Sequence, residues 1–192
     1  MQTKASDATE RTAANGDCSE SDSVKLAAGE LYRTAALLVG KEEIALRVVE
    51  ASLASVEVDP CAEGDAAREA VQNDVIRRAL AEIAGGQPGA LEPAAAPEMG
   101  GCVDTEDAGF SREQFETLSA GSGRVRMRQW LDGLAPAERS VFVLRGVLGR
   151  SGAETAELLA EATGHGWQPQ QVGGVYRSAL CSLASSVVHS AA

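Results

Sequence analysis

The sequence predicts an all-α protein made of two small helical domains joined by a Gly/Pro-rich linker. Ala, Leu, Val and Glu are abundant, whereas aromatic residues make up only 4% of the 192 positions. No segment shows the sustained alternation of apolar and polar residues that is typical of a strand. Apolar residues instead recur at steps of three and four between Gly- and Pro-containing breaks, and the last two helical segments are spaced as a helix-turn-helix.

Charge and hydropathy narrow the function classes. The formal net charge of −11 argues against a protein that simply coats nucleic acid. This charge is divided unequally, with −13 on residues 1–123 and +2 on residues 124–192. No stretch approaches the roughly 18 uninterrupted apolar residues of a membrane helix, and the first residues lack the apolar centre of a secretory signal. We therefore expect a cytoplasmic protein without a membrane segment.

The N-terminal part divides into a tail and a three-helix domain. Residues 1–22 consist mainly of Ser, Thr, Ala, Asn and charged residues, and we expect them to be a disordered tail. Residues 23–84 form the first domain. Its helices are expected from Ser21 or Ser23 to Gly40, from Lys41 to about Val56, and from Asp65 to about Ala84. The side chains expected to face inward are Leu26, Leu31, Tyr32, Ala35, Leu38, Val39, Ile44, Val48, Val49, Leu53, Val56, Ala66, Ala70, Val71, Val75, Ile76, Leu80 and Ile83.

Residues 85–110 are predicted to be the linker, because Gly and Pro recur there too often for a regular element. The second domain spans residues 111–192. Ser111 with Gln114 is a capping-box pattern that opens a short helix through about Leu118, and a further helical segment leads into the C-terminal helices.

Three helices are expected after Leu131. Pro136 suits the first turn of a helix, whose apolar face contains Phe142, Val143, Val147 and Leu148 and which stops at Gly149. Ser151 and Glu154 form a capping box for the second helix, with Ala156, Leu158 and Leu159 inward. Gly164, Gly166 and Pro169 mark a turn. The stripe of the last helix consists of Val172, Val175, Tyr176, Ala179, Leu180, Leu183 and Val187.

Signals for catalysis or metal binding are weak. His165 lies in a glycine-flanked turn and His189 lies near the end of the last helix, so neither has an evident catalytic partner. The four cysteines, Cys18, Cys61, Cys102 and Cys181, are far apart, and we expect free thiols rather than metal ligands or a redox pair. Trp130 is expected to pack, and Trp167 to fill the gap between the last two helices. The sequence therefore predicts no enzyme activity, no cofactor and no metal site.

The order of motifs in the C-terminal region resembles region four of an extracytoplasmic-function type bacterial sigma factor. The matching residues are Leu134, Pro136, Glu138, Arg139, Val141, Phe142, Leu144, Thr155, Ala156, Leu158, Leu159 and Val172. The segment LYRTAALLVGKEEIALRVVEASLASV, residues 31–56, is similar to the start of region two in the same family. The resemblance implies a divergent sigma-factor-like transcription protein. Its expected partners are the RNA polymerase core, promoter DNA and an anti-sigma protein.

The helix-turn-helix supplies the residues expected to contact DNA. Residues at the start of the second helix of such a motif reach base edges, and basic or hydroxyl side chains nearby hold phosphates. The residues expected to read bases are Gln168, Gln170 and Gln171. Gly173 and Gly174 would permit a close approach of the helix to DNA, and Arg177 and Ser178 would hold the DNA backbone. Under the resemblance, Glu42, Glu43 and Glu50 would face the polymerase.

A second interpretation comes from another class of protein. Arg177 is the only Lys or Arg between Gln168 and Ser190, and one phosphate contact supports only weak DNA binding. The small side chains between Gly173 and Ser186 suit close packing between helices. The alternative is therefore a helical interaction or regulatory protein that keeps the sigma scaffold and has lost DNA binding.

Overall fold

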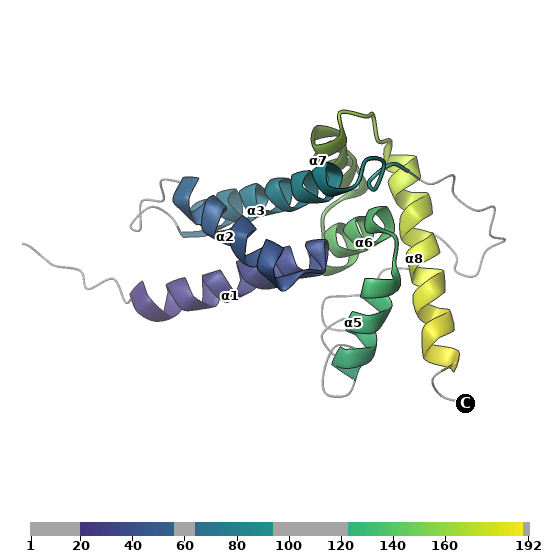
Figure 1. The fold of residues 1–192 in the computed structure, drawn as a ribbon, viewed down its shortest axis with the longest axis horizontal. Coiled ribbons are helices and arrows are strands. Elements are labelled where there is room, and N and C mark those ends of the chain that lie inside the picture. Colours follow the sequence, from purple (N-terminus) through teal and green to yellow (C-terminus); the bar gives the residue numbers. More distant parts are fainter. Residues whose placement is uncertain (1–19, 56–63, 94–122, 190–192) are drawn as a thin grey trace, which may run out of the picture.

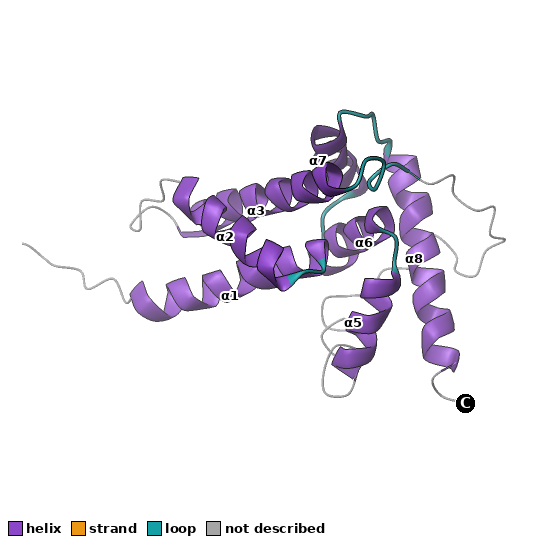
Figure 2. Cartoon of the chain, viewed as in Figure 1, coloured by secondary structure: helices purple, strands orange, loops and turns teal. Residues whose placement is uncertain are grey.

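The structure is a computed structural model that describes residues 20–55, 64–93 and 123–189. Every regular element in these ranges is a helix and none is a strand, which confirms the all-α class (Figures 1 and 2). The elements are α1 (Glu20–Val39), α2 (Glu42–Ser55), α3 (Gly64–Gly86), α5 (Gly123–Gly133), α6 (Pro136–Phe142), the π-helical segment η1 (Val143–Val147), α7 (Gly152–Thr163) and α8 (Pro169–His189).

The first three helices pack against one another. The chain reverses between α1 and α2 at Gly40, where the N–H donates to the Ala36 carbonyl at 3.0 Å. Gly40 has a φ of +70°, which glycine adopts at no steric cost. The predicted end of the first helix at this glycine is confirmed.

Most side chains predicted to face inward from these helices are buried or half-buried. Leu53 is an exception at 49% exposed, because the buried stripe of α2 ends at Ser52 and the next residue points roughly 100° away. Ala70 is exposed for the same reason, since the inward stripe of α3 begins one residue later, at Val71. The inward predictions for Leu53 and Ala70 are therefore wrong. The side chains of Leu26, Val56 and Ala66 lie outside those that the structure describes.

The start of the predicted linker is folded onto the core. After α3 the chain makes a tight turn, with the Ala90 N–H donating to Gln87 O and the Glu92 N–H to Gly89 O, each at 3.0 Å. Within this turn Leu91 is only 1% exposed. Residues 94–110 of the predicted linker, the short helix predicted from Ser111 and residues 1–19 of the predicted tail lie outside the described residues.

Local sequence signals set the ends of the C-terminal helices. Pro136 lies in the first turn of α6. At the start of α7 the Glu154 N–H donates to Ser151 Oγ at 3.2 Å and the Ser151 N–H donates to Glu154 Oε2 at 2.7 Å, so the predicted capping box is present. Gly164, with a φ of +68°, ends α7 as predicted.

The π-helical segment η1 was not predicted. The Leu148 N–H donates to the carbonyl of Val143, five residues earlier, at 2.9 Å. Gly146 is buried within this segment, and a Cβ there would lie 3.2 Å from the Tyr176 hydroxyl. The missing side chain at Gly146 therefore leaves room for Tyr176 of α8.

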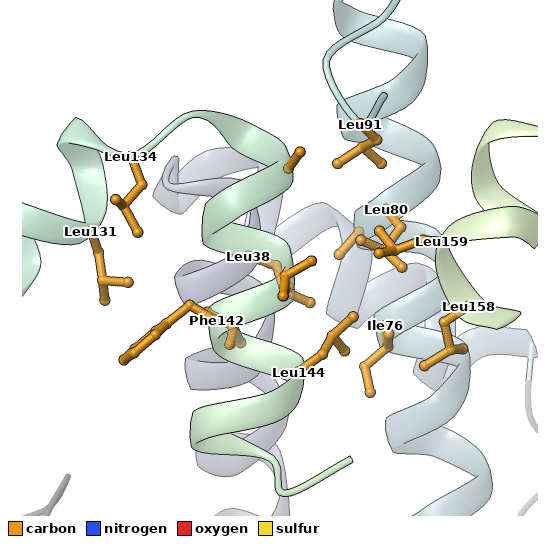
Figure 3. Close-up of a cluster of buried hydrophobic side chains, with 14 of the residues drawn as sticks. Leu38, Ile76, Leu80, Leu91, Leu131, Leu134, Phe142, Leu144, Leu158 and Leu159 are labelled. Carbon is orange, nitrogen blue, oxygen red and sulfur yellow. The ribbon is translucent and has the colours of Figure 1, made fainter. Parts of the chain in front are cut away.

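The two halves of the chain share one hydrophobic core. Helix α3 packs against α7, and α1 packs against α6 and η1. Leu80 of α3 lies beside Leu159 of α7, and Ile76 faces Leu158 and Leu144 (Figure 3). Polar contacts follow the same junction, because Arg77 Nε lies 2.9 Å from Glu161 Oε2 and Arg150 Nη2 donates to Asn73 Oδ1 at 2.6 Å. The two predicted domains are thus packed together.

Leu159→Ala should lower the free energy of unfolding by about 2–5 kcal/mol, because truncation of a fully buried leucine leaves a cavity. Leu46→Ala is the matched control, since Leu46 is 51% exposed and its truncation should change stability by less than about 0.5 kcal/mol. Urea unfolding followed by circular dichroism measures both variants. Equal losses for the two would contradict this account of the core.

Candidate nucleic-acid interface

Helices α7 and α8 form the predicted helix pair, and α8 also packs against α6. The inward stripe of α8 is buried as predicted through Leu183, and the side chain of Val187 lies outside those described. Trp167 is buried just before α8, and its Nε1 donates to the Leu91 carbonyl at 3.0 Å. This hydrogen bond fixes the start of α8 against the turn after α3. Trp167 is thus buried as expected, and its hydrogen-bond partner lies in the turn after α3.

The first turn of α8 carries the three glutamines predicted to read bases. Gln168, Gln170 and Gln171 are all exposed, and the helix begins at Pro169, which tolerates the first helical position. Gln171 Oε1 accepts from the Gln168 N–H at 2.8 Å, so this side chain caps its own helix. The side chains of Gln168 and Gln170 make no hydrogen bond to another described residue, and of these two residues Gln170 lies within α8.

Further along α8 lie the two side chains predicted to contact the phosphates of DNA, and only one of them is free of a partner within the described residues. Arg177 is exposed, and α8 contains no other Arg or Lys. Ser178 Oγ donates to Glu138 Oε1 at 3.2 Å, which engages the hydroxyl and places a carboxylate beside this face. Gly173 and Gly174 are half-buried, and a Cβ at Gly173 would meet nothing within 4 Å.

Nearby arginines are engaged within the protein. Arg145 Nη1 donates to the Arg150 carbonyl at 2.8 Å, and its guanidinium carbon lies 5.5 Å from the centroid of the Tyr176 ring. Burial raises the pKa of Tyr176, and the charge of Arg145 partly opposes this upward shift. The phenol therefore stays neutral at physiological pH. Arg145 therefore links η1 to α8 through the ring of Tyr176.

The residues predicted to face polymerase lie on the outer side of α2. Glu42, Glu43 and Glu50 are exposed, and Glu42 Oε1 lies 3.4 Å from Arg128 Nη2 of α5. Leu46 and Leu53, at 51% and 49% exposed, are on the same side of the helix because residues seven apart are two turns apart. This exposed pair was not predicted from the sequence, although the spacing of the two leucines among glutamates was a usable signal.

Cys181 of α8 is disulfide-bonded, so the expectation of a free thiol is wrong for this residue. Spacing along the chain did not reveal it, because pairing depends on the distance between cysteines in the fold. Cys18, Cys61 and Cys102 lie outside the described residues.

Within the described ranges, no three His, Cys, Asp or Glu side chains gather as metal ligands would. None of the helices described there has the length and apolarity needed to cross a membrane.

No protein-family model matches this chain, and no curated protein or solved structure matches it either. Two surfaces are candidate interfaces: the outer side of α2, with two leucines among glutamates, and the start of α8, with Gln170 and Arg177.

The pH dependence of stability tests the capping box that starts α7. Hydrogen bonds from the hydroxyl and the backbone N–H of Ser151, with Arg150 nearby, hold the pKa of Glu154 below its ordinary value of 4.5. The ionised carboxylate therefore stabilises the fold above that pH, and its contribution is lost as the pH falls through the folded-state pKa. Glu154→Gln should lower Tm at neutral pH, and this difference should shrink as the pH is lowered. A difference in Tm that does not change with pH would contradict the hydrogen-bonded role of the carboxylate.

Proposed function

We propose that this chain is a divergent sigma-factor-like transcription protein that binds RNA polymerase through the outer side of α2. The observation that carries the proposal is the pair of half-exposed leucines, Leu46 and Leu53, set among Glu42, Glu43 and Glu50. An apolar centre within a charged rim is the usual composition of a protein-binding surface. The resemblance of residues 31–56 to region two of the sigma family supports polymerase as the partner.

The energetics of this surface favour a protein partner. Among the described residues the large hydrophobic side chains that are exposed are Leu46, Leu53 and Val125, and two of these three share one side of α2. Burying the exposed half of each leucine would contribute on the order of 1 kcal/mol. The glutamates would steer a basic partner surface and would contribute more to the association rate than to affinity. An anti-sigma protein would compete for the same side of α2.

Promoter DNA is the second partner in the proposal. Gln170 would contact a base edge and Arg177 a phosphate. One phosphate contact gives weak binding alone, but attachment to polymerase would raise the local concentration of α8 near DNA. The proposal places the protein in the cytoplasm. Disulfides that form in that compartment are usually transient, so the bond at Cys181 would be a reversible one.

A helical interaction protein without DNA binding is the second candidate. The favouring observation is that two of the predicted DNA contacts are already engaged within the protein, because Gln171 caps α8 and Ser178 donates to Glu138. Arg177 is then the one basic side chain available on α8. Such a protein would bind polymerase or a true sigma factor through α2 and would leave DNA uncontacted.

Leu46→Asp combined with Leu53→Asp should reduce capture of purified RNA polymerase core at least tenfold, because two charges replace the apolar centre of the interface. Val125→Asp is the matched control: Val125 is an apolar residue 61% exposed on α5, and its substitution should leave capture unchanged. Pull-down with the folded variants measures the effect. Full capture of polymerase by the double variant would show that the outer side of α2 does not bind polymerase.

Arg177→Ala should weaken binding to a double-stranded promoter fragment equally for all sequences. It should also lower the magnitude of the slope of log K against log salt concentration by about 0.9, the share of one phosphate contact. Arg33→Ala, an exposed arginine of α1, is the control and should change neither quantity. Fluorescence anisotropy with polymerase bound gives both values. If Arg177→Ala leaves DNA binding unchanged both in the free protein and in its complex with polymerase, the interaction protein without DNA binding is the better description.

A further inference from the structure

A cavity of about 370 Å³ opens at the junction of the two halves of the chain. Its apolar lining comes from Leu38, Val39, Ile44, Ile83 and Pro136. Its charged lining residues are two basic ones, Arg139 and Lys41, and two acidic ones, Glu82 and Asp132. Leu38 is fully buried, and the other four apolar side chains are only partly covered. Cavities of this size that combine apolar side chains with a few polar groups are typical small-molecule sites.

The hydrogen-bonding capacity of Arg139 is largely unused. Its Nη2 reaches the carbonyls of Asp132 and Leu134 only at 3.5 Å, the outer limit of a hydrogen bond. Its Nε is buried without a hydrogen-bond partner. No carboxylate of the described residues lies within 4.0 Å of the guanidinium. Burial lowers the pKa of Arg139, and the more distant Asp132 charge opposes that shift.

Gly40 keeps the guanidinium in this place. A Cβ at Gly40 would collide with Arg139 Nη1, so a larger residue at this turn would displace the guanidinium. A half-buried cation without a close counter-ion is costly, because it has lost water and gained no partner. A ligand that supplied one negative charge would remove that cost.

We propose that this cavity binds a small organic monocarboxylate whose apolar tail lies on the leucine, valine and isoleucine side chains and whose carboxylate accepts hydrogen bonds from Arg139. Arginine donors suit a carboxylate in geometry and charge. Lys41 adds a second positive charge to the lining, and Asp132 and Glu82 offset it, so the cavity does not favour phosphate or any other anion of higher charge. Because the lining comes from both halves of the chain, a bound ligand stabilises their packed arrangement.

Calorimetric titration of the full chain with hexanoate, hexanol and hexylammonium tests the site. Hexanoate should bind at least about tenfold more tightly than hexanol, because only the acid pairs with Arg139. Hexylammonium should not bind. Hexanol binding as tightly as hexanoate, or no hexanoate binding at all, would overturn the proposal.

Matched variants locate the site. Arg139→Gln should reduce the preference for hexanoate over hexanol several-fold and leave only the contribution of Lys41. Asp132→Asn should tighten hexanoate binding several-fold because a like charge is removed. Arg128→Gln, the same change on an arginine outside the cavity lining, should have no effect. Unchanged hexanoate affinity in both Arg139→Gln and Asp132→Asn would place the ligand elsewhere.

A filling variant keeps the test decisive if Arg139→Gln fails to fold. Ala90 lines the cavity from the turn after α3 and is only partly buried, so a larger side chain there is tolerated. Ala90→Leu should weaken hexanoate and hexanol together by occupying the space of the tail. Unchanged affinity for both compounds in the folded Ala90→Leu protein would overturn the proposal.

Discussion

The packing of α3 against α7 is the contact on which the rest of the structure depends. It brings Leu80 and Leu159, both fully buried, to the same place in the core and joins the three N-terminal helices to the C-terminal ones (Figure 3). The ion pair between Arg77 and Glu161 lies on the exposed rim of this junction and contributes little by comparison. Apolar burial therefore holds the halves together.

The same packing decides which surfaces are available to partners. Helix α2 lies on the far side of α3 from α7, so its outer side, with Leu46 and Leu53, stays uncovered (Figure 1). The start of α8, in contrast, is held against the turn after α3 by the hydrogen bond from Trp167 to Leu91. Under the proposed function, a protein partner would meet an open surface on α2, whereas DNA would approach α8 beside a folded turn. The cavity at Arg139 exists only while the halves remain packed.

How much could be predicted from the sequence depended on how local each signal was. The capping box of Ser151 and Glu154 and the helix ends at Gly40 and Gly164 are set by a few neighbouring residues, and all were predicted. The burial of Leu91 and the exposure of Leu53 depend on which helix packs where, and hydrophobic spacing alone did not reveal them. Similarly, the engagement of candidate DNA contacts by other side chains, such as Ser178 by Glu138, joins residues 40 positions apart.

A double-mutant cycle on Leu80 and Leu159 in the full chain is the most direct measurement of the central claim, that both halves share one core. If the two side chains pack together, Leu80→Ala and Leu159→Ala should be non-additive in the free energy of unfolding, with a coupling of at least about 0.5 kcal/mol. The unfolding transition should remain single for all four proteins. Effects that add to within about 0.3 kcal/mol, or two separate transitions, would show that the halves fold around independent cores and would contradict the account.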